Sequence, residues 1–332
     1  MQIVVVGPAA TEYAFAPVEE ELRRRGQEVI RYHGAAPFLA KPDALAKADI
    51  LYGNGYPCTR ALLETAPQLR AVVNPWIGME GFDVAGATAL GIVVANGQVS
   101  ENYLSVAEAT IMLILACLHN LPEKLAALRN NQPAPSRMNA RMLRGKTLGM
   151  IGFGNMARAI AHRLSTWDVT MQAYAPRLRE PLPSYVERVE LDDLLKTSDV
   201  VCVLATLNAE TRHMLTYGRL RLMKKDAILV NTARGGIADE AALVQIAKEG
   251  RLHKIALDVF ETEPLPADNA LRDLPNAILT PHCVGHSREG AEAVPKTAIE
   301  NIARALAGEP PLYVVNPDVL PRWQERWRSS RA

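Results

Sequence analysis

The stretch Thr147–Arg158, TLGMIGFGNMAR, decides the fold of this chain. An apolar β-type run leads directly into Gly152 and Gly154, and a helix-like pattern follows. The first glycine permits a tight turn, the second lets a pyrophosphate approach the backbone, and the small Ala157 lets helix and strand pack closely. An ordinary glycine turn is the plainer alternative, but the order of strand, turn and helix favours a dinucleotide site. The cofactor-binding residues expected here are Gly152, Gly154, Asn155 and Met156.

Short β-type runs alternate with helical patterns on both sides of this stretch. The expected strands before it are Ile3–Val6, Val29–Tyr32, Ile50–Leu51, Ala71–Val73 and Ile92–Ala95, and the helices between them are Val18–Arg25, Ala44–Ala48, Ala61–Thr65 and Val84–Leu90. The later strands are Leu148–Ile151, Thr170–Ala173, Val200–Leu204, Ala227–Asn231, Ile255–Leu257 and Ala277–Leu279, and a final helix covers Gly290–Ala307. Strict alternation with short loops predicts an α/β protein with two doubly wound parallel sheets.

Composition narrows the function. With 332 residues, two domains are expected. The 37 Lys and Arg residues balance 36 Asp and Glu residues, so no global field attracts nucleic acid or an anionic membrane. The start, MQIVVVGP, lacks the basic region of a signal peptide. Four widely spaced cysteines without a CxxC pair suggest reduced core thiols rather than disulfides or a metal site. We therefore expect a cytoplasmic protein that acts on a small molecule.

A long apolar helix is expected at about Leu104–Leu118, continuing into Glu123–Arg129, before a polar loop at Asn131–Arg144. Its longest apolar stretch, Ala109–Leu118, is shorter than the roughly 18 residues that a membrane span needs. Such a helix is too apolar for an exposed surface, and we expect it between domains or in a subunit interface.

Three loops that follow expected strands carry candidate catalytic groups. Arg234 lies between Ala233 and two glycines, and a guanidinium there suits bidentate capture of a carboxylate. Asp258, Glu261 and Glu263 follow the next strand, and His282 follows the one after. Taken singly, Arg234 also fits a surface salt bridge, the three acids fit a solvated loop, and His282 fits an ordinary surface or core imidazole. Together, a guanidinium, an imidazole and a carboxylate suit carbonyl–alcohol interconversion beside a nicotinamide.

Four ordered motifs carry a resemblance. From about Ala71 to Ala307 the chain resembles the D-isomer-specific 2-hydroxyacid dehydrogenase family, through LRGKTLGMIGFGNMA, VNTARGG, ALDVFETEP and LTPHCVGHS. The resemblance implies a flavodoxin-like substrate-binding domain of residues 1–98 plus 288–332 and a Rossmann coenzyme domain of residues 99–287. It also implies a cleft between them, hinged near Asn96–Ser105 and after His282.

The resemblance also implies roles for single residues. Arg234 would bind the carboxylate of a 2-oxo acid and polarise its carbonyl, and His282 would be the general acid in reduction. Glu263 would orient His282 and favour its protonated form, with Glu261 as the weaker choice. Formate dehydrogenases of this superfamily carry Gln where this chain has Glu263, which argues against that relative. Further cofactor contacts are expected at Asp258, Val106, Thr232 and Ala233, and substrate contacts at Trp76, Ile77, Gly78 and Arg234; no metal is expected.

Two positions depart from the common pattern. In NAD users an acid ends the second strand of the fingerprint and binds the ribose 2′-OH. This chain instead has Ala175, Arg177 and Arg179 there, with no acid until Glu180. The missing carboxylate and the two arginines favour NADP(H), with NAD(H) as the alternative cofactor. In the substrate loop the family often has glycine where this chain has Trp76, whose ring would narrow or line the pocket.

These inferences converge on an NADPH-preferring, homodimeric reductase of small 2-oxo acids, with hydroxypyruvate or glyoxylate as the leading substrate. Two alternatives stay open. One is an NAD-linked dehydrogenase of the same family that oxidises 3-phosphoglycerate or phosphite. The other is a non-enzymatic, cofactor-sensing scaffold like the family's transcriptional co-repressors, which the complete Arg234, Glu263 and His282 set argues against.

Overall fold

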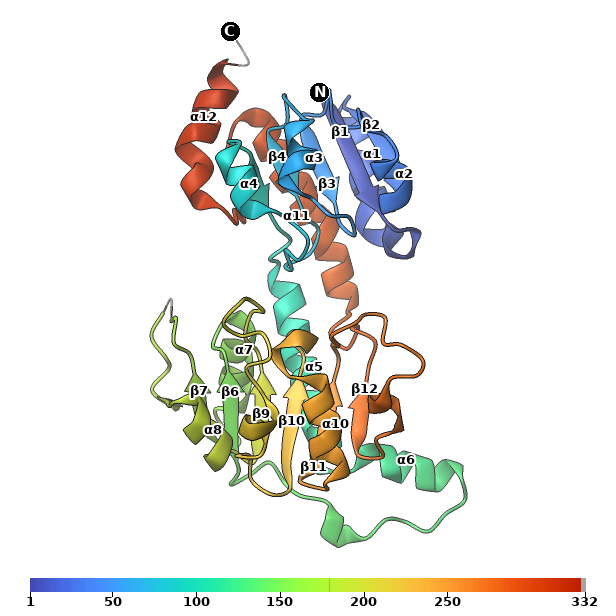
Figure 1. Ribbon diagram of the computed structural model, residues 1–332, viewed down its shortest axis with the longest axis vertical. Helices are drawn as coiled ribbons and strands as arrows, with labels where there is room; N and C mark the ends of the chain where they lie inside the picture. The colour runs from blue at the N-terminus through green and yellow to red at the C-terminus, as the bar shows by residue number, and fades with distance from the viewer. Residues whose placement is uncertain (179, 330–332) are drawn as a thin grey trace. The chain divides into compact units, whose positions relative to one another are not determined.

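The computed structural model describes residues 1–178 and 180–329 (Figure 1). The chain forms two compact units, Met1–Asn102 with Ser287–Ala332, and Tyr103–His286. Each unit is an α/β domain built on one parallel sheet, which confirms the expected fold class. The dinucleotide fingerprint lies in the second unit.

The sheet of the first unit has the strand order β2-β1-β3-β4-β5, which is the flavodoxin-like order. Its strands are β1 (Gln2–Gly7), β2 (Glu28–His33), β3 (Ile50–Gly53), β4 (Ala71–Val73) and β5 (Val93–Ala95). One face is covered by α1 (Glu12–Arg24), α11 (Arg288–Ala307) and α12 (Leu320–Ser329), and the other by α2 (Ala35–Leu39), α3 (Arg60–Glu64) and α4 (Val84–Ala89). Short 3₁₀ turns, Ala9–Thr11 and Pro317–Val319, precede α1 and α12.

The C-terminal segment completes the core of this first unit. Trp323 of α12 is only 1% exposed, and its indole Nε1 donates to the carbonyl of Arg70 at 2.9 Å. A buried indole normally finds such a partner. Helix α12 therefore contributes a buried side chain to the core of the first unit, the domain to which the family resemblance assigns residues 288–332.

One helix of the first unit was misplaced by the sequence pattern. Residues Ala44–Ala48 form successive turns, with amides bonding to carbonyls three residues back, and α2 lies earlier at Ala35–Leu39. Burial does not separate the two stretches, because Phe38 of α2 and Leu45 and Ala48 of the expected helix all pack in the same core. A stretch of five residues is too short for its own pattern to fix a helix.

The second sheet has the order β12-β11-β10-β9-β6-β7-β8, with all strands parallel. Its strands are β6 (Thr147–Ile151), β7 (Thr170–Tyr174), β8 (Val186–Arg188), β9 (Val200–Val203), β10 (Ala227–Asn231), β11 (Leu252–Leu257) and β12 (Ala277–Leu279). From β8 to β11 this is the Rossmann order, extended by β12. Short β8 was not predicted, because one buried residue of three leaves little apolar pattern to detect.

Helices cover both faces of this sheet (Figure 1). One core contains side chains of α5 (Ser100–Leu118) and α7 (Asn155–Leu164), and the other those of α8 (Leu191–Thr197), α9 (Tyr217–Leu220) and α10 (Glu240–Lys248). Successive residues of one strand enter opposite cores; Val200 and Cys202 face α5, and Val201 and Val203 face α10. The sheet is therefore apolar on both sides, as parallel sheets require.

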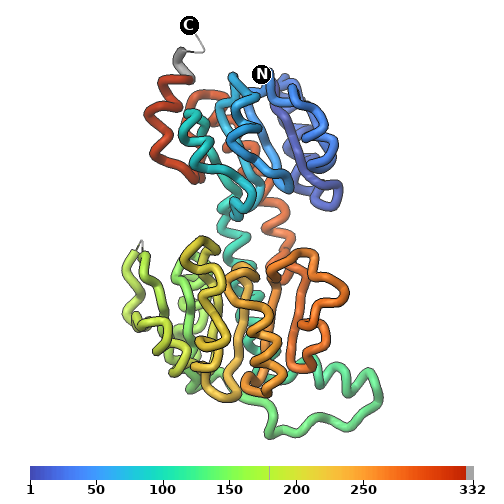
Figure 2. The backbone as a smooth tube through the Cα atoms, viewed as in Figure 1, coloured from blue at the N-terminus to red at the C-terminus, as the bar shows by residue number. Residues whose placement is uncertain are grey.

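The long apolar helix does not continue as expected. It ends at Leu118, and Asn120 adopts a left-handed conformation (φ 48°) before α6 (Leu121–Arg129) begins. Asn tolerates this backbone better than other non-glycine residues, so it can separate two helices that share one apolar pattern. Figure 2 shows the chain from α6 to β6 as an extended loop, interrupted by a 3₁₀ turn at Arg137–Asn139.

Helix α5 is also long and apolar enough to cross a membrane by length and composition, with a mean hydropathy of 1.4. The expected apolar stretch was shorter because Ser100–Glu108 carries polar residues that still belong to the helix. Eight of its residues are buried, and most of them pack in the Rossmann-type core, as in the core helix of a soluble protein.

The four cysteines are unpaired, and burial raises the pKa of the Cys58 and Cys117 thiols to about 12.

Candidate active site

The fingerprint turn has the geometry that its glycines predict. Gly152 has φ +92°, and a Cβ there would lie 2.7 Å from the backbone of Ala205. Only glycine therefore fits this turn without strain. Gly154 precedes the first turn of α7, and a Cβ there would meet no atom within 4 Å among the described residues. The space beside Gly154 and the free N–H groups of a ten-residue helix suit a pyrophosphate.

The loop after β7 places Ala175 and Arg177 at the carboxyl edge of the same sheet. Ala175 is buried, whereas Arg177 is exposed and forms an ion pair with Glu210 from the loop after β9. Arg179, the second expected phosphate ligand, lies outside the described residues.

Three loops at this edge carry the expected catalytic residues. Arg234 follows β10, Glu263 follows β11 and His282 follows β12, and these three strands are neighbours in the sheet. The carboxyl ends of parallel strands form the ligand edge of such sheets. The topology thus explains how residues distant in sequence come to one place.

His282 and Glu263 are in direct contact. His282 Nδ1 lies 2.6 Å from Glu263 Oε2, and Glu263 Oε1 accepts the backbone N–H of Phe260 at 3.0 Å. The hydrogen bond to Glu263 raises the pKa of His282, although partial burial opposes that rise. Partial burial alone would raise the pKa of Glu263, but the bonds from His282 and Phe260 outweigh it and the pKa is lowered. The pair therefore favours an imidazolium beside a carboxylate.

Arg234 is close enough for its charge to act on both members of this pair. Its positive charge helps to lower the pKa of Glu263 and opposes the rise at His282. Its Nη1 donates to the carbonyl of Ala233 at 2.7 Å, and its neighbour Gly235 must be glycine because a Cβ would lie 2.0 Å from the backbone of Phe260. A guanidinium, an imidazole and a carboxylate thus lie at one edge of the sheet.

Two buried polar residues shape these loops. Asp258 Oδ1 accepts the Thr280 hydroxyl at 2.6 Å and the amides of Cys283 and Val284 at 3.0 and 3.1 Å, which fixes the chain around His282. Its expected contact with the nicotinamide stays a prediction. Asn231 closes the turn before Arg234, since its Nδ2 donates to the Arg234 carbonyl at 3.0 Å.

Sequence reasoning missed Asn231. The available signal was an Asn at the end of a buried strand, a position where Asx turns are common.

The other expected cofactor contacts lie in the second unit. Thr232 is buried and its hydroxyl lies 2.9 Å from that of Thr110 on α5, and Val106 of α5 packs against Gly285, where a Cβ would be 2.4 Å away. Ala233 is buried. Asn155 and Met156 begin α7. Their contacts with a cofactor remain predictions.

Trp76, Ile77 and Gly78 lie in the first unit, in the loop after β4. Asn74 accepts the Trp76 amide at 3.2 Å and donates to the Gly78 carbonyl at 2.5 Å, so one side chain shapes this loop. The Trp76 ring packs near Tyr13, with centroids 6.0 Å apart. Their role in substrate binding stays a prediction.

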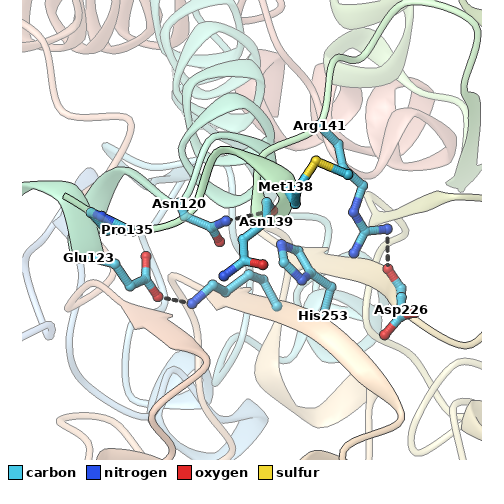
Figure 3. A pocket seen from close by; sticks show the side chains of 9 residues that line it. Asn120, Glu123, Pro135, Met138, Asn139, Arg141, Asp226 and His253 are labelled. Carbon is cyan, nitrogen blue, oxygen red and sulfur yellow. Dashed lines mark hydrogen bonds and ion pairs between the residues drawn. The ribbon is translucent and has the colours of Figure 1, made fainter.

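A pocket of about 540 Å³ lies at the opposite edge of the second sheet (Figure 3). Its lining is polar and charged except for Pro135 and Met138; the other residues are Asn120, Glu123, Asn139, Arg141, Asp226, His253 and Lys254. Lys254 pairs with Glu123, and Arg141 donates to the Asp226 carbonyl at 3.0 Å. Because β10 and β11 begin here, this pocket is separate from the edge that carries His282.

Comparison with known proteins agrees with this architecture. Residues 111–284 match the family model described as D-isomer specific 2-hydroxyacid dehydrogenase, NAD binding domain. A glyoxylate reductase from Thermofilum pendens is 36% identical over 268 residues, covering 78% of each chain. The chain belongs to the D-isomer specific 2-hydroxyacid dehydrogenase family.

Relatives within this family differ in length and in name. A D-3-phosphoglycerate dehydrogenase from Methanocaldococcus jannaschii is 36% identical over 86% of this chain, which spans only 55% of that longer protein. Among solved structures, the NADPH-dependent glyoxylate/hydroxypyruvate reductase of Sinorhizobium meliloti, in complex with NADP and malonate, has a TM-score of 0.83. It is 28% identical, and the match covers 96% of this chain and 97% of that one.

Proposed function

We propose that this protein reduces a small 2-oxo acid to a D-2-hydroxy acid with NADPH, with hydroxypyruvate or glyoxylate as the leading substrate. The observation that carries the proposal is the 2.6 Å contact between His282 Nδ1 and Glu263 Oε2, with Arg234 close enough to influence both. These groups follow the strands β10, β11 and β12, at the edge where the fingerprint turn also begins.

Each group has a distinct task in this reaction. The Arg234 guanidinium binds the substrate carboxylate and draws electron density from the carbonyl. Nδ1 of His282 is engaged by Glu263, so the proton passes to the carbonyl oxygen from Nε2. Glu263 stabilises the imidazolium that must be present before this transfer. The nicotinamide cofactor, when bound at Gly152, Gly154 and the start of α7, supplies the hydride.

The preference for NADPH rests on the loop after β7. Ala175 occupies the position where NAD users carry an acid, so the residue at this position does not repel a 2′-phosphate. Arg177 is exposed and already pairs with an anion, Glu210. The S. meliloti reductase named above is described as NADPH-dependent, which supports this choice.

An NAD-linked oxidation of 3-phosphoglycerate is the second candidate, because the M. jannaschii relative carries that name. Initial rates with a panel of 2-oxo acids, each with NADPH and NADH, separate the two. We expect glyoxylate and hydroxypyruvate to be reduced fastest with NADPH, and Arg177→Ala to weaken NADPH more than NADH. A clear preference for NADH, or turnover confined to 3-phosphoglycerate, would contradict the proposal.

We also propose that the protein is a cytoplasmic homodimer. Apolar side chains of α5, α6 and the following loop are exposed in the single chain, among them Met112, Leu121, Leu125, Leu128 and Met138. Leu128 is 84% exposed and Met138 88%, which is unusual for such residues and supports an interaction surface here. Light scattering should give twice the chain mass, and Leu128→Glu should shift the protein toward monomer. A monomeric wild-type protein would refute the proposal.

A further inference from the structure

An ion pair links two loops at the carboxyl edge of the second sheet. Arg177 follows β7, Glu210 follows β9, and their side chains pair through Arg177 Nη2 and Glu210 Oε1. Strand β6 lies between β7 and β9, and it leads directly into Gly152. The pair therefore joins the two loops that flank the start of the dinucleotide-binding turn.

Glu210 is held by a closed turn. The side-chain oxygen of Asn208 accepts the amides of Glu210 and Thr211 at 2.8 and 3.1 Å, and the Thr211 hydroxyl donates to the Thr206 carbonyl at 2.7 Å. Ala205, near the start of the same loop, packs against Gly152. Hydrogen bonds within the loop, as well as the ion pair, therefore hold Glu210 in place.

The loop that carries Arg177 is tied to the fingerprint helix by a different arginine. Arg158 of α7 donates to the carbonyls of Glu180 and Pro181 at 2.7 and 3.1 Å, and its guanidinium lies 5.2 Å from the centre of the Phe153 ring. Arg158 therefore has a structural task. Arg177 pairs with a side-chain carboxylate, and 73% of its own side chain and 66% of that of Glu210 are exposed.

An exposed pair of this kind contributes little to stability and opens readily. A phosphate dianion is a stronger partner for a guanidinium than a single carboxylate, because it offers more acceptor oxygens and more charge. A ribose 2′-phosphate that reaches Arg177 must displace Glu210 and lie near its negative charge. NADH has no such phosphate and leaves the ion pair intact.

We propose that Glu210 is a specificity-determining residue that competes with the ribose 2′-phosphate of NADP(H) for Arg177. The inference rests on the proposed function in that it needs a dinucleotide at this turn. Glu210 thereby raises the dissociation constant of NADPH and leaves that of NADH unchanged. Removing its charge should therefore increase the affinity for NADPH relative to NADH.

Dissociation constants for NADPH and NADH, measured by nucleotide fluorescence, test this without any substrate. Glu210→Gln should bind NADPH about three- to tenfold more tightly, because the competing ion pair with Arg177 and the repulsion between Glu210 and the 2′-phosphate are both lost. Its dissociation constant for NADH should not change. The gain should shrink in high salt. Glu249→Gln is the matched control, since Glu249 is an exposed acid bonded to Tyr217 at the end of α10, and its loss should change neither constant.

A double-mutant cycle separates competition for Arg177 from a general repulsion between Glu210 and the phosphate. In an Arg177→Ala background, most of the gain from Glu210→Gln should disappear. An equal gain in that background, or an unchanged NADPH constant in Glu210→Gln, overturns the inference. If the wild-type protein prefers NADH, the proposed cofactor preference fails, but the inference stands provided that Glu210→Gln still tightens NADPH.

Discussion

Replacing Glu263 by Gln tests the proposed acid–base pair most directly. The change keeps the shape of the side chain but removes the charge that His282 Nδ1 contacts at 2.6 Å. A hydrogen bond to a charged group contributes about 1.5–3 kcal/mol. The His282 side chain is 47% exposed and that of Glu263 is 34% exposed, so solvent screening reduces this to about 1–1.5 kcal/mol. We therefore expect kcat/KM for reduction at neutral pH to fall about tenfold.

The pH dependence gives the sign of the effect. Glu263 raises the pKa of His282, and reduction needs the protonated imidazole. Activity in the direction of reduction should therefore decline as the pH rises through the pKa of His282. In Glu263→Gln this decline should begin at lower pH. At acidic pH, where His282 is protonated in both proteins, the difference in kcat/KM between wild type and variant should become small.

The assay is kcat/KM for reduction of the best 2-oxo acid with NADPH across a pH series. Glu261→Gln is the matched control, because Glu261 instead accepts the Glu240 amide at 3.0 Å and lies 3.1 Å from His213 Nε2. Its alkaline decline should coincide with that of the wild-type protein. An unshifted decline in Glu263→Gln would refute the reasoning, as would the same shift in both variants.

The pair also predicts how stability depends on pH. The raised pKa of His282 contributes stability that is present below the unfolded pKa of His and is lost as the pH rises through the folded value. The lowered pKa of Glu263 contributes stability that is present above the unfolded pKa of Glu and is lost as the pH falls. The difference in unfolding free energy between wild type and Glu263→Gln should thus be largest at mildly acidic pH, measured by urea unfolding.

Two further predictions concern the two sheets. Gly152→Ala should destabilise the second unit by about 1–3 kcal/mol in urea unfolding, because its φ is +92° and the new Cβ would lie 2.7 Å from the Ala205 backbone. Gly154→Ala should leave the unfolding transition unchanged and weaken NADPH binding, since its Cβ would enter open space beside α7; equal stability losses in both variants would contradict this. Trp323→Ala should destabilise the first unit by about 3–5 kcal/mol, measured in the same way, and a loss below about 1 kcal/mol would show that α12 does not complete that core.

The alternation of strands and helices could be predicted because each element has a local pattern of apolar residues. Buried parallel strands are continuous apolar runs, and the expected β6, β7 and β10 each begin or end within one residue of the observed strand. Elements with little apolar pattern were missed or misplaced. Strand β8 has one buried residue, and α2 depends on Phe38 rather than on a repeated apolar face.

The sequence by itself determined which chemical groups follow which strands, because the residue after a strand is fixed by covalent order. It also determined the fingerprint turn, since steric limits on φ make Gly152 nearly irreplaceable. Only the tertiary structure decided which of these groups meet. Glu263 contacts His282, whereas Glu261, two residues earlier, contacts His213 and the start of α10. Likewise, Arg177 meets Glu210 because β7 and β9 flank β6. Such contacts depend on strand order and loop path, which no local pattern encodes.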